Sequence, residues 1–310
     1  MNINNIRKII KKGRILQNEP MSAHTSFRVG GPARYYFIPG DEAEAASLVS
    51  YLYKNGLEYQ IIGNGSNLLV SDRGYEGAII DLGRHDGTSF TMLGIDDQRE
   101  DGKVIFDCGA GCLLSAIGSF ALRCSATGFE ALSGIPGCIG GACIMNAGAY
   151  GSEIGDVITA VTVLNRTGEK KRLERSELTF GYRHSSLLEE GYIVLRAEVL
   201  LDKGDPAQIE ARMKELTAQR KEKQPLEYPS AGSTFKRTKG DFAGRLIEEA
   251  GLRGYRLGGA MVSEKHCGFI INYDHASAAD IYALINEVRD RVHEKSGVML
   301  EPEVRFLGDF

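Results

Sequence analysis

The sequence lacks the patterns that mark several common classes of protein. Its six cysteines include no C-x-x-C pair and no His–Cys spacing of a zinc site, which excludes the usual zinc motifs. The net charge of −4 leaves no basic excess for a nucleic-acid backbone, so we expect no nucleic-acid partner. A Walker A sequence is absent as well. The first 20 residues hold only short apolar runs broken by Arg and Lys, so no signal peptide is predicted.

The remaining composition is that of an ordinary globular protein. Charged residues make up 25% and apolar residues 43% of the chain, which is typical of well-packed domains. Several cysteines lie beside glycines or in apolar runs, where a reduced thiol acts as a small hydrophobic group. This pattern predicts a reducing, cytoplasmic location. A length of 310 residues predicts two or three domains.

One long segment carries no charge. Between Glu130 and Glu153 lie 22 consecutive uncharged residues, six of them glycines. A membrane span is not predicted, because each glycine costs a helix about 1 kcal/mol relative to alanine, and Pro136 and Asn146 weaken a helix further. We expect irregular backbone wrapped closely around a ligand, since glycine lets backbone donors approach a ligand without a Cβ in the way.

Helix and strand patterns alternate along the chain and predict an α+β fold. Helices are expected over residues 42–55, 112–125, 206–223, 242–252 and 276–297. Strands are expected over residues 33–40, 59–63, 77–82, 103–111, 192–201 and 304–308, with a hairpin that turns at Thr167–Gly168. The composition shifts near residues 220 to 225, where Pro225 ends a charged helix, and we expect a domain boundary there.

Two glycine-rich turns are candidates for a phosphate site. The sequence "GNGSN" (63–67) follows a strand and could hold a pyrophosphate on its backbone N–H groups, although a tight loop without a ligand explains it equally well. The dinucleotide-binding fingerprint fails, because Leu68 occupies its third glycine position, and "GAGCLL" fails in the same way at Leu114. A large anionic cofactor would need both a phosphate turn and a smooth backbone wall, and the uncharged run could form that wall.

Five motifs, taken in order, resemble a known family. They are "HTSFRVGGPA" (24–33), "GNGSNLLVSD" (63–72), "SGIPGCIGGACIMNAGAYG" (133–151), "FGYRHS" (180–185), and "AGSTFKR" with the distant "LEPEVRFLG" (300–308). Together they closely resemble the UDP-N-acetylenolpyruvoylglucosamine reductase (MurB) family of peptidoglycan synthesis, from about His24 to Gly308. The short run from Tyr182 into the next strand leaves little room for the tyrosine-bearing loop inserted in the first subclass. The chain therefore resembles the second subclass.

The resemblance implies the FAD-binding fold of the vanillyl-alcohol oxidase/PCMH type, with two α+β subdomains, and a C-terminal α+β substrate-binding domain. It places the first subdomain at residues 1–80, joined by the C-terminal strand 304–310, the second at 81–222 and the substrate domain at 223–303. FAD is expected to bind non-covalently. The implied cofactor-binding residues are Gly63, Asn64, Gly65, Ser66, Asn67, Gly134, Ile135, Pro136, Gly137, Gly140, Asn146, Gly148 and Ala149.

The reaction of this family reduces UDP-N-acetylglucosamine enolpyruvate to UDP-N-acetylmuramate. Hydride passes from NADPH to FAD and then to the terminal vinyl carbon, and a proton is added to the neighbouring carbon. The matching motifs imply that Arg183 binds the substrate carboxylate, that Glu303 donates a hydrogen bond to the enolate-like intermediate, and that Ser233 donates the proton. Arginine suits this role because its guanidinium matches a carboxylate bidentately. Lys223 and Arg237 are candidate ligands of the UDP diphosphate, although Lys223 fits a solvated helix face equally well.

The three catalytic candidates also have structural interpretations. Without the resemblance, Arg183 is typical of a surface arginine, and Ser233 of a turn residue or helix cap. Glu303 could pair with Arg305, and spacing alone does not separate Glu303 from Glu301.

Two other functions compete with the reductase. An FAD-dependent oxidase or dehydrogenase of the same fold, acting on a sugar or hydroxy acid, would not need Arg183, Ser233 and Glu303 together. Such enzymes often bind flavin covalently, and His24 and Cys138 are the candidate tethers here. A non-catalytic nucleotide-sugar sensor would keep the glycine turns without the acid and the arginine. The sequence favours the reductase, with UDP-N-acetylglucosamine enolpyruvate as its small-molecule substrate and neither nucleic acid nor membrane as a partner.

Overall fold

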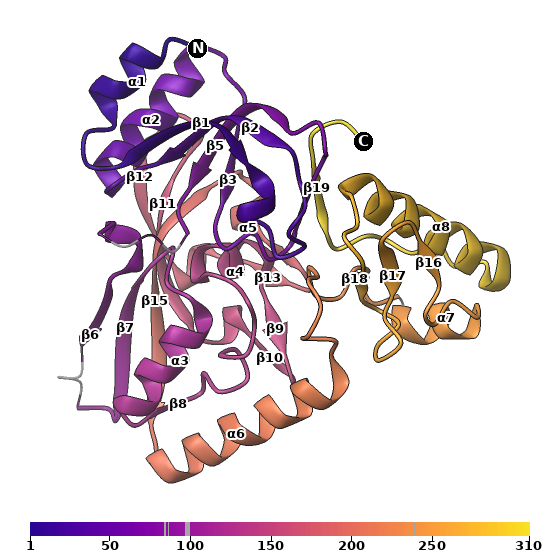
Figure 1. The fold of residues 1–310 in the computed structure, drawn as a ribbon. Coiled ribbons are helices and arrows are strands. Elements are labelled where there is room, and N and C mark those ends of the chain that lie inside the picture. The colour runs from indigo at the N-terminus through magenta and orange to yellow at the C-terminus, as the bar shows by residue number, and fades with distance from the viewer. Residues whose placement is uncertain (84, 86, 97–99, 239) are drawn as a thin grey trace. The chain divides into compact units, whose positions relative to one another are not determined.

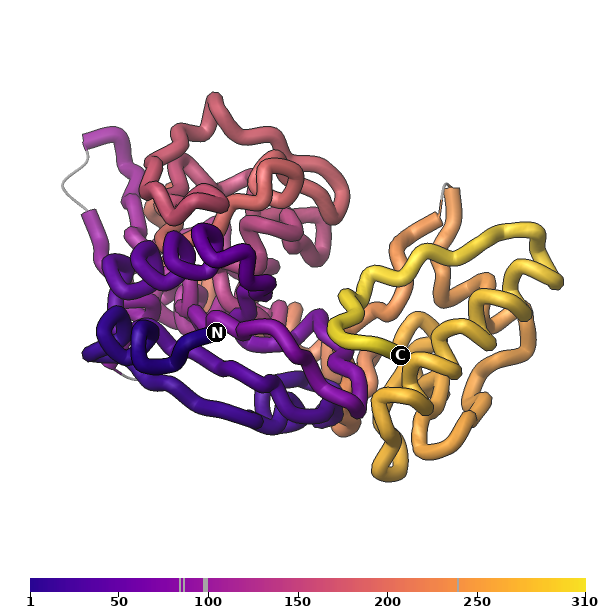
Figure 2. The backbone as a smooth tube through the Cα atoms, turned by 90° about the horizontal axis from the view of Figure 1, so that it is seen from above, coloured from indigo at the N-terminus to yellow at the C-terminus, as the bar shows by residue number. Residues whose placement is uncertain are grey.

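The computed structural model describes residues 1–83, 85, 87–96, 100–238 and 240–310. Over these residues the chain divides into two compact units. Unit 1 comprises Met1–Leu16, Tyr35–Asn64 and Gly77–Ala218, and unit 2 comprises Gln17–Arg34, Gly65–Glu76 and Gln219–Phe310. Figure 2 follows the chain from its indigo N-terminal end, in unit 1, to its yellow C-terminal end, in unit 2. The three-part division expected from the sequence stays a prediction.

The first sheet has the strand order β1-β2-β5-β3, and β3 and β5 are parallel. Its strands are β1 (Arg14–Pro20), β2 (Pro32–Ile38), β3 (Tyr59–Ile62) and β5 (Tyr75–Asp81). Helices α1 (Ile3–Ile9) and α2 (Glu42–Lys54) belong to unit 1, and the Asp41 carboxylate caps α2 by accepting the Glu44 N–H at 2.9 Å. The apolar faces of both helices share one core with Phe37 and Ile80 of the sheet.

The second sheet belongs wholly to unit 1 and is antiparallel, with the order β12-β11-β15-β7-β6 and β8 paired to β15 (Figure 1). Its strands are β6 (Leu93–Asp96), β7 (Lys103–Gly109), β8 (Ala126–Thr127), β11 (Ile158–Leu164), β12 (Lys170–Glu174) and β15 (Ile193–Lys203). Helices α3 (Leu114–Arg123) and α4 (Ile139–Met145) share an apolar core with this sheet.

Shorter elements complete unit 1. They are the two-residue strands β9 (Gly148–Ala149), β10 (Ser152–Glu153), β13 (Phe180–Gly181) and β14 (His184–Ser185), the helix α5 (Ser186–Glu189), and the 3₁₀ turns η2 (Ser89–Thr91), η3 (Ile154–Asp156) and η4 (Arg175–Glu177). Helix α6 (Pro206–Lys223) begins in unit 1 and ends in unit 2.

Unit 2 has its own core around a long helix. Its elements are the 3₁₀ turn η1 (Met21–Ala23), the parallel pair β4 (Leu68–Val70) and β19 (Arg305–Leu307), the antiparallel sheet β16 (Arg256–Leu257), β17 (Ala260–Val262) and β18 (Ile270–Asn272), and helices α7 (Ala243–Glu249) and α8 (Ala278–Ser296). The buried face of α8, which includes Ile281, Leu284 and Val288, packs in one core with Leu69 and Val304.

The predicted α+β class is confirmed, and so are the helices expected from capping and proline signals. Helix α2 begins after Asp41, and α6 begins at Pro206 and ends before Pro225. The predicted hairpin is also confirmed as the antiparallel pair of β11 and β12. Each of these elements carries local capping, breaking or turn chemistry, which a sequence displays directly.

The prediction of irregular backbone for the whole uncharged run was wrong for residues 139–145, which form α4. Four of its seven residues are buried, and the Gly140 N–H donates to the Ala110 carbonyl at 2.9 Å. A Cβ on Gly140 would lie 2.9 Å from the Ala110 Cβ, so this helix approaches the neighbouring backbone too closely for a side chain. Tertiary packing therefore outweighs the poor helix propensity of glycine.

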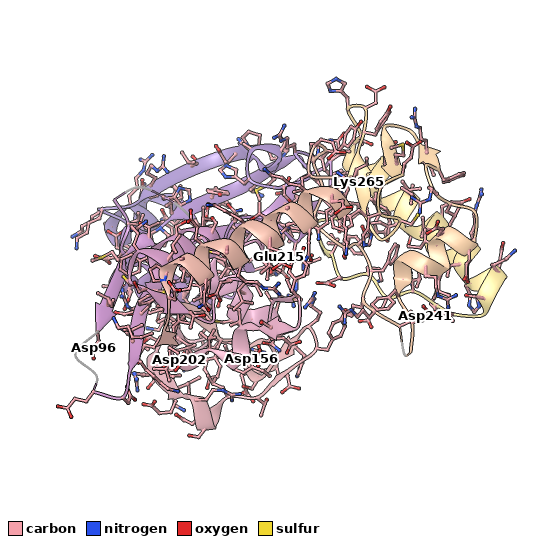
Figure 3. All side chains as sticks on the ribbon, turned by 90° about the horizontal axis from the view of Figure 1, so that it is seen from below. Asp96, Asp156, Asp202, Glu215, Asp241 and Lys265 are labelled. Atoms are coloured by element: carbon pink, nitrogen blue, oxygen red, sulfur yellow. The ribbon has the colours of Figure 1, made fainter. Side chains whose placement is uncertain are left out.

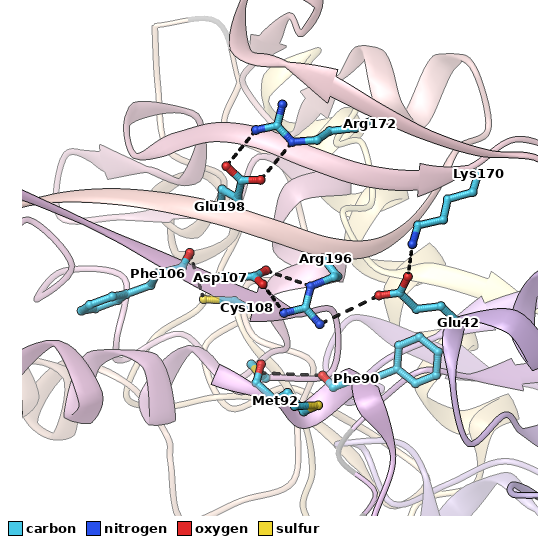
Figure 4. Close-up of polar contacts among 11 residues, drawn as sticks. Glu42, Phe90, Met92, Phe106, Asp107, Cys108, Lys170, Arg172, Arg196 and Glu198 are labelled. Carbon is cyan, nitrogen blue, oxygen red and sulfur yellow. Dashed lines mark hydrogen bonds and ion pairs between the residues drawn. The ribbon is translucent and has the colours of Figure 1, made fainter. Parts of the chain in front are cut away.

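Ion pairs join Glu42 of α2 to the edge strand β12 and the inner strand β15 of the second sheet (Figure 4). The Arg196 guanidinium is bidentate on Asp107 and lies 3.9 Å from Glu42, which also pairs with Lys170 at 2.5 Å. The hydrogen bond with Asp107 raises the pKa of Arg196, so this partly buried guanidinium stays charged. Other charged side chains, such as Glu215 of α6, stand on the surface (Figure 3).

The six cysteines are free, as the reduced state predicts. Burial raises the pKa of Cys112 to about 11 and that of Cys143 to about 12, so both thiols are protonated at neutral pH. Over the described ranges, none of the helices is both long and apolar enough to cross a membrane.

Alanine substitution at two adjacent glycines of α4 should change the free energy of unfolding in opposite directions. Gly140→Ala should lower the free energy of unfolding by about 1–3 kcal/mol, because its Cβ overpacks against Ala110. Gly141→Ala is the matched control, because no atom lies within 4 Å of its Cβ, and alanine favours a helix by about 1 kcal/mol. Urea unfolding of both variants measures the difference. Equal loss of stability in both would contradict the close packing of α4.

Candidate active site

Three loops at the ends of strands in unit 1 approach one another through bare backbone. Gly63 follows β3 and Gly83 follows β5, and these strands are parallel, so both loops leave the same edge of the sheet. A Cβ on Gly83 would lie 2.8 Å from the Gly63 carbonyl oxygen, and one on Gly111 would lie 2.4 Å from the Gly83 oxygen. The sequence reasoning missed Gly83 and Gly111, although a glycine just after a strand was the available signal.

The glycine-rich run lies against two of these loops, those that contain Gly63 and Gly111. Its residues 137–140 pair with residues 110–114, through bonds from the Leu114 N–H to the Gly137 carbonyl at 3.0 Å and from the Ile139 N–H to the Cys112 carbonyl at 2.9 Å. A Cβ on Gly63 would lie 3.5 Å from the Cβ of Cys138, an ordinary contact. The structure therefore brings together Gly63 and the predicted cofactor residues Gly137 and Gly140.

Other predicted cofactor residues of unit 1 lie on turns around α4. Gly134, Ile135 and Pro136 form the turn before α4, where the Ile135 N–H donates to the Leu132 carbonyl at 3.0 Å. Gly148 and Ala149 form β9, which pairs with β10. Asn64, the last residue of its segment in unit 1, is exposed. Their assignment to the cofactor stays a prediction.

Arg183 lies at the tip of a two-residue hairpin turn between β13 and β14. Its φ of +53° is in the left-handed region, and its guanidinium lies 5.1 Å from the centre of the Tyr182 ring. The hairpin is tied to the C-terminal end of α4 on both strands. The Asn146 amide donates to the Gly181 carbonyl at 2.9 Å, and the Ser185 hydroxyl donates to the Ile144 carbonyl at 2.7 Å.

Asn146 is fully buried, and the protein uses its whole side-chain amide. Nδ2 also donates to the Glu153 carboxylate at 2.6 Å, and Oδ1 accepts the Gly155 N–H at 3.0 Å. The backbone of Asn146 is left-handed, with φ of +43°, which asparagine tolerates better than most residues. These contacts support a role in holding the Arg183 hairpin, and its assignment to the cofactor stays a prediction.

In unit 2, Gly65 packs against the backbone of His24 and Thr25 in the "HTSF" motif. Its φ is +59°, and a Cβ there would lie 1.8 Å from the His24 carbonyl oxygen. The Ser26 N–H donates to the Gly65 carbonyl at 3.1 Å, while the Ser26 hydroxyl oxygen is buried without a hydrogen-bond partner among the described residues. His24 itself pairs with Glu19 at 2.8 Å.

Ser233 and Glu303 lie on neighbouring backbone segments of unit 2. Thr234, the residue after Ser233, accepts the Glu303 N–H on its carbonyl at 2.8 Å, and Phe235 forms an antiparallel bridge with Pro302. Ser233 is exposed and Glu303 half-buried, whereas Thr234 is fully buried. The structure therefore holds the two predicted catalytic residues of unit 2 close along the backbone, and Arg183 belongs to unit 1.

The neighbouring charged candidates differ in their surroundings. Glu301 is exposed and pairs with Lys236 at 2.5 Å, which occupies its carboxylate on the surface. Lys223 is the exposed last residue of α6. The guanidinium of Arg237 lies 5.4 Å from the centre of the Phe242 ring. Lys223 and Arg237 stay predictions as substrate ligands.

Both units contain residues whose chemistry suits the binding of an FAD cofactor. Neighbouring backbone fills the Cβ positions of Gly65, Gly83 and Gly111, so these glycines let the turns pack closely, and glycine-rich turns of this kind can offer backbone N–H groups to a pyrophosphate. The buried Ser26 hydroxyl is a donor that a phosphate oxygen would satisfy. Among the described residues no group of three or more His, Cys, Asp or Glu side chains could hold a metal ion.

Gly65 and Gly56 form a matched pair for substitution, because both have φ of +59°. Gly65→Ala should abolish FAD retention or weaken it by about tenfold or more, since its Cβ collides with the His24 carbonyl and displaces the turn. Gly56→Ala has no atom within 4 Å of its Cβ, so it carries the backbone strain alone. The measurement is the FAD dissociation constant of the reconstituted apoprotein. Equal affinities in the two variants would contradict a role for the Gly65 turn.

Comparisons with known proteins agree with this geometry. The model of the UDP-N-acetylenolpyruvoylglucosamine reductase C-terminal domain matches residues 224–307, and that of an FAD binding domain matches residues 32–174. The predicted FAD-binding fold with a separate C-terminal domain is therefore confirmed, and so is the prediction of FAD as cofactor.

Full-length relatives extend the match. UDP-N-acetylenolpyruvoylglucosamine reductase from Agathobacter rectalis is 49% identical over 96% of this chain and 95% of its own length. The protein of that name from Caldanaerobacter subterraneus is 47% identical over 99% of this chain and 98% of its own length. The crystal structure of the Thermus caldophilus enzyme superposes with a TM-score of 0.77 at 34% identity, over 96% of this chain and 99% of that chain. The chain belongs to the UDP-N-acetylenolpyruvoylglucosamine reductase (MurB) family.

Proposed function

We propose that this protein reduces UDP-N-acetylglucosamine enolpyruvate to UDP-N-acetylmuramate in peptidoglycan precursor synthesis, with NADPH as the hydride donor. Family membership over almost the whole chain supports the reaction. The observation that carries it in the structure is the backbone pairing of Thr234 with Glu303, which brings together the main chains of two distant motifs, one with Ser233 and the other with Glu303. The six free cysteines support work in a reducing cytoplasm.

Bound FAD would supply the redox chemistry, accepting hydride from NADPH and delivering it to the vinyl carbon of the sugar. The protein then has to orient the enolpyruvyl group, stabilise the negative charge that develops next to the carboxylate, and deliver one proton. Arg183, Ser233 and Glu303 are the residues that we propose for these tasks.

Arg183 would bind the substrate carboxylate. A guanidinium is permanently charged and forms two parallel hydrogen bonds with a carboxylate, so it stabilises charge delocalised onto that group. The hairpin that carries Arg183 is anchored to α4 through Asn146 and Ser185, which limits its freedom before substrate binds. Its short connections also support the second subclass, without an inserted loop between β14 and β15.

Ser233 and Glu303 would act at the carbon that is protonated. Ser233 is exposed, so a substrate can reach its hydroxyl, and the buried Thr234 holds the backbone next to it. A serine hydroxyl is a weak acid and serves as a donor only toward a strongly basic carbanion. A carboxylic acid at Glu303 would donate a hydrogen bond to the same enolate-like group. Lys223 and Arg237 would bind the diphosphate as cations.

An anaerobic titration tests the proposed reaction directly. NADPH should bleach the flavin band of the purified protein, and UDP-N-acetylglucosamine enolpyruvate should restore it. Bleaching without recovery would replace the proposed substrate with another acceptor, such as that of an oxidase or dehydrogenase of the same fold. Mass spectrometry of the denatured protein should show no flavin attached to His24 or Cys138.

Glu303 and Glu301 form a matched pair for the catalytic role. Glu303→Ala should slow flavin reoxidation by the enolpyruvyl sugar by about 100-fold, the usual scale for a positioned acid, and leave reduction by NADPH unchanged. Glu301→Ala removes a surface ion pair with Lys236 and should change either rate by less than about twofold. Stopped-flow absorbance measures both half-reactions. A larger effect in Glu301→Ala would reassign the acid to that residue.

A further inference from the structure

The segment that carries Glu303 lies between two partner segments in unit 2. On one side, the Glu303 N–H donates to the Thr234 carbonyl at 2.8 Å, and the Lys236 N–H donates to the Glu301 carbonyl at 2.9 Å. On the other side, β19 pairs in parallel with β4, beginning with Arg305 opposite Leu68. Glu303 is thus the residue at which the segment passes from one partner to the other.

Asn67 makes the contact on the second side. Its side-chain Nδ2 donates to the Glu303 carbonyl at 3.1 Å, and its own carbonyl accepts the Arg305 N–H at 3.1 Å. The side chain therefore extends the β4–β19 pairing by one step beyond the end of the two strands. Asn67 is also the last residue of the "GNGSN" turn, and it lies 236 positions from Glu303 in the sequence.

The opposite contact is rigid, because Thr234 is held on three sides. Its N–H donates to the Gly268 carbonyl at 2.8 Å, and its hydroxyl accepts the Ile270 N–H at 3.0 Å. Thr234 is fully buried. Val304, the residue after Glu303, is buried in the same core as Leu69. Asn67 and Thr234 together form hydrogen bonds with both polar groups of the Glu303 backbone, its carbonyl and its N–H.

We propose that Asn67 is a positioning residue for Glu303, setting where the carboxyl group stands relative to Ser233. The proposal rests on the catalytic role of Glu303 in the proposed function. Asn67 acts through the backbone of Glu303 and need not touch the substrate. Because the geometry of reacting groups strongly affects rate, a shift of about 1 Å at Glu303 lowers the protonation rate by about 100-fold.

Asn67→Asp is the sharpest test. It keeps the size of the side chain but replaces the donor with a carboxylate oxygen, which repels the Glu303 carbonyl. The matched control is Asn272→Asp, because the Asn272 amide donates to the Phe27 carbonyl at 3.0 Å in the same unit and not to the Glu303 carbonyl. Both variants lose one amide-to-carbonyl bond, so a general loss of stability affects them alike.

Three measurements define the expected result. In Asn67→Asp saturated with FAD, flavin reoxidation by the enolpyruvyl sugar slows by about 100-fold, which is at least about tenfold more than any slowing of the reduction by NADPH. In the FAD-free protein, hydrogen exchange at the Arg305 amide, which donates to the Asn67 carbonyl, becomes about tenfold faster, because losing the adjacent side-chain bond loosens this end of the β4–β19 pairing. Asn272→Asp shows none of these changes. In a Glu303→Ala background, Asn67→Asp slows reoxidation no further.

Other results would overturn the proposal. Weaker FAD binding with equal loss of both half-reactions would make Asn67 a cofactor ligand only. The same profile in Asn272→Asp would make its role general stability, and additive losses with Glu303→Ala would show that it does not act through Glu303. If the sugar does not reoxidise the wild-type flavin, the proposed function fails. Unchanged exchange at the Arg305 amide in Asn67→Asp separately refutes the proposal that Asn67 positions this segment.

Discussion

The parallel pairing of β19 with β4 is the contact on which unit 2 depends. It joins residues 68–70 to residues 305–307, and it holds the candidate acid Glu303 between this pair and the segment after Ser233. Closing so long a loop costs about 3 kcal/mol more than closing a loop of about five residues, because the entropic cost rises with the logarithm of loop length. Burial of Leu69, Val304 and Leu307 offsets it, at about 25 cal/mol for each Å² of apolar surface removed from water.

Unit 1 depends on a different constraint, which is the absence of side chains where backbones meet. Gly83, Gly111 and Gly140 each lie so close to a neighbouring main chain that a Cβ would come within 3 Å of another atom. This close packing sets the position of α4, and the C-terminal end of α4 in turn anchors the Arg183 hairpin through Asn146. A buried amide with all its hydrogen bonds made is well suited to this, since each bond lost there costs about 1–3 kcal/mol.

Much of this could be predicted where the chemistry is local. Asp41 and Pro206 mark the starts of two helices because capping and proline geometry act within one turn of the chain. The "GNGSN" turn was recognisable because a left-handed residue such as Gly65 requires glycine. Helix α4 was not, because its stability comes from contact with residues 110–114 and not from its own propensity. Asn146 and Thr234 gave no local signal for the contacts that they make.

The order of the motifs along the chain was enough to indicate the family, the FAD cofactor and the candidates Arg183, Ser233 and Glu303. Residue type settles what a guanidinium, a hydroxyl and a carboxyl can do, and this information needs no coordinates. Which side chains serve as supports was decided by folding, since Asn67 meets Glu303 only when strands from distant parts of the chain pair. The same folding separates Glu301, which pairs with Lys236 on the surface, from the half-buried Glu303 two residues later. Sequence spacing cannot make that distinction, because burial and pairing depend on what the rest of the chain places beside each residue.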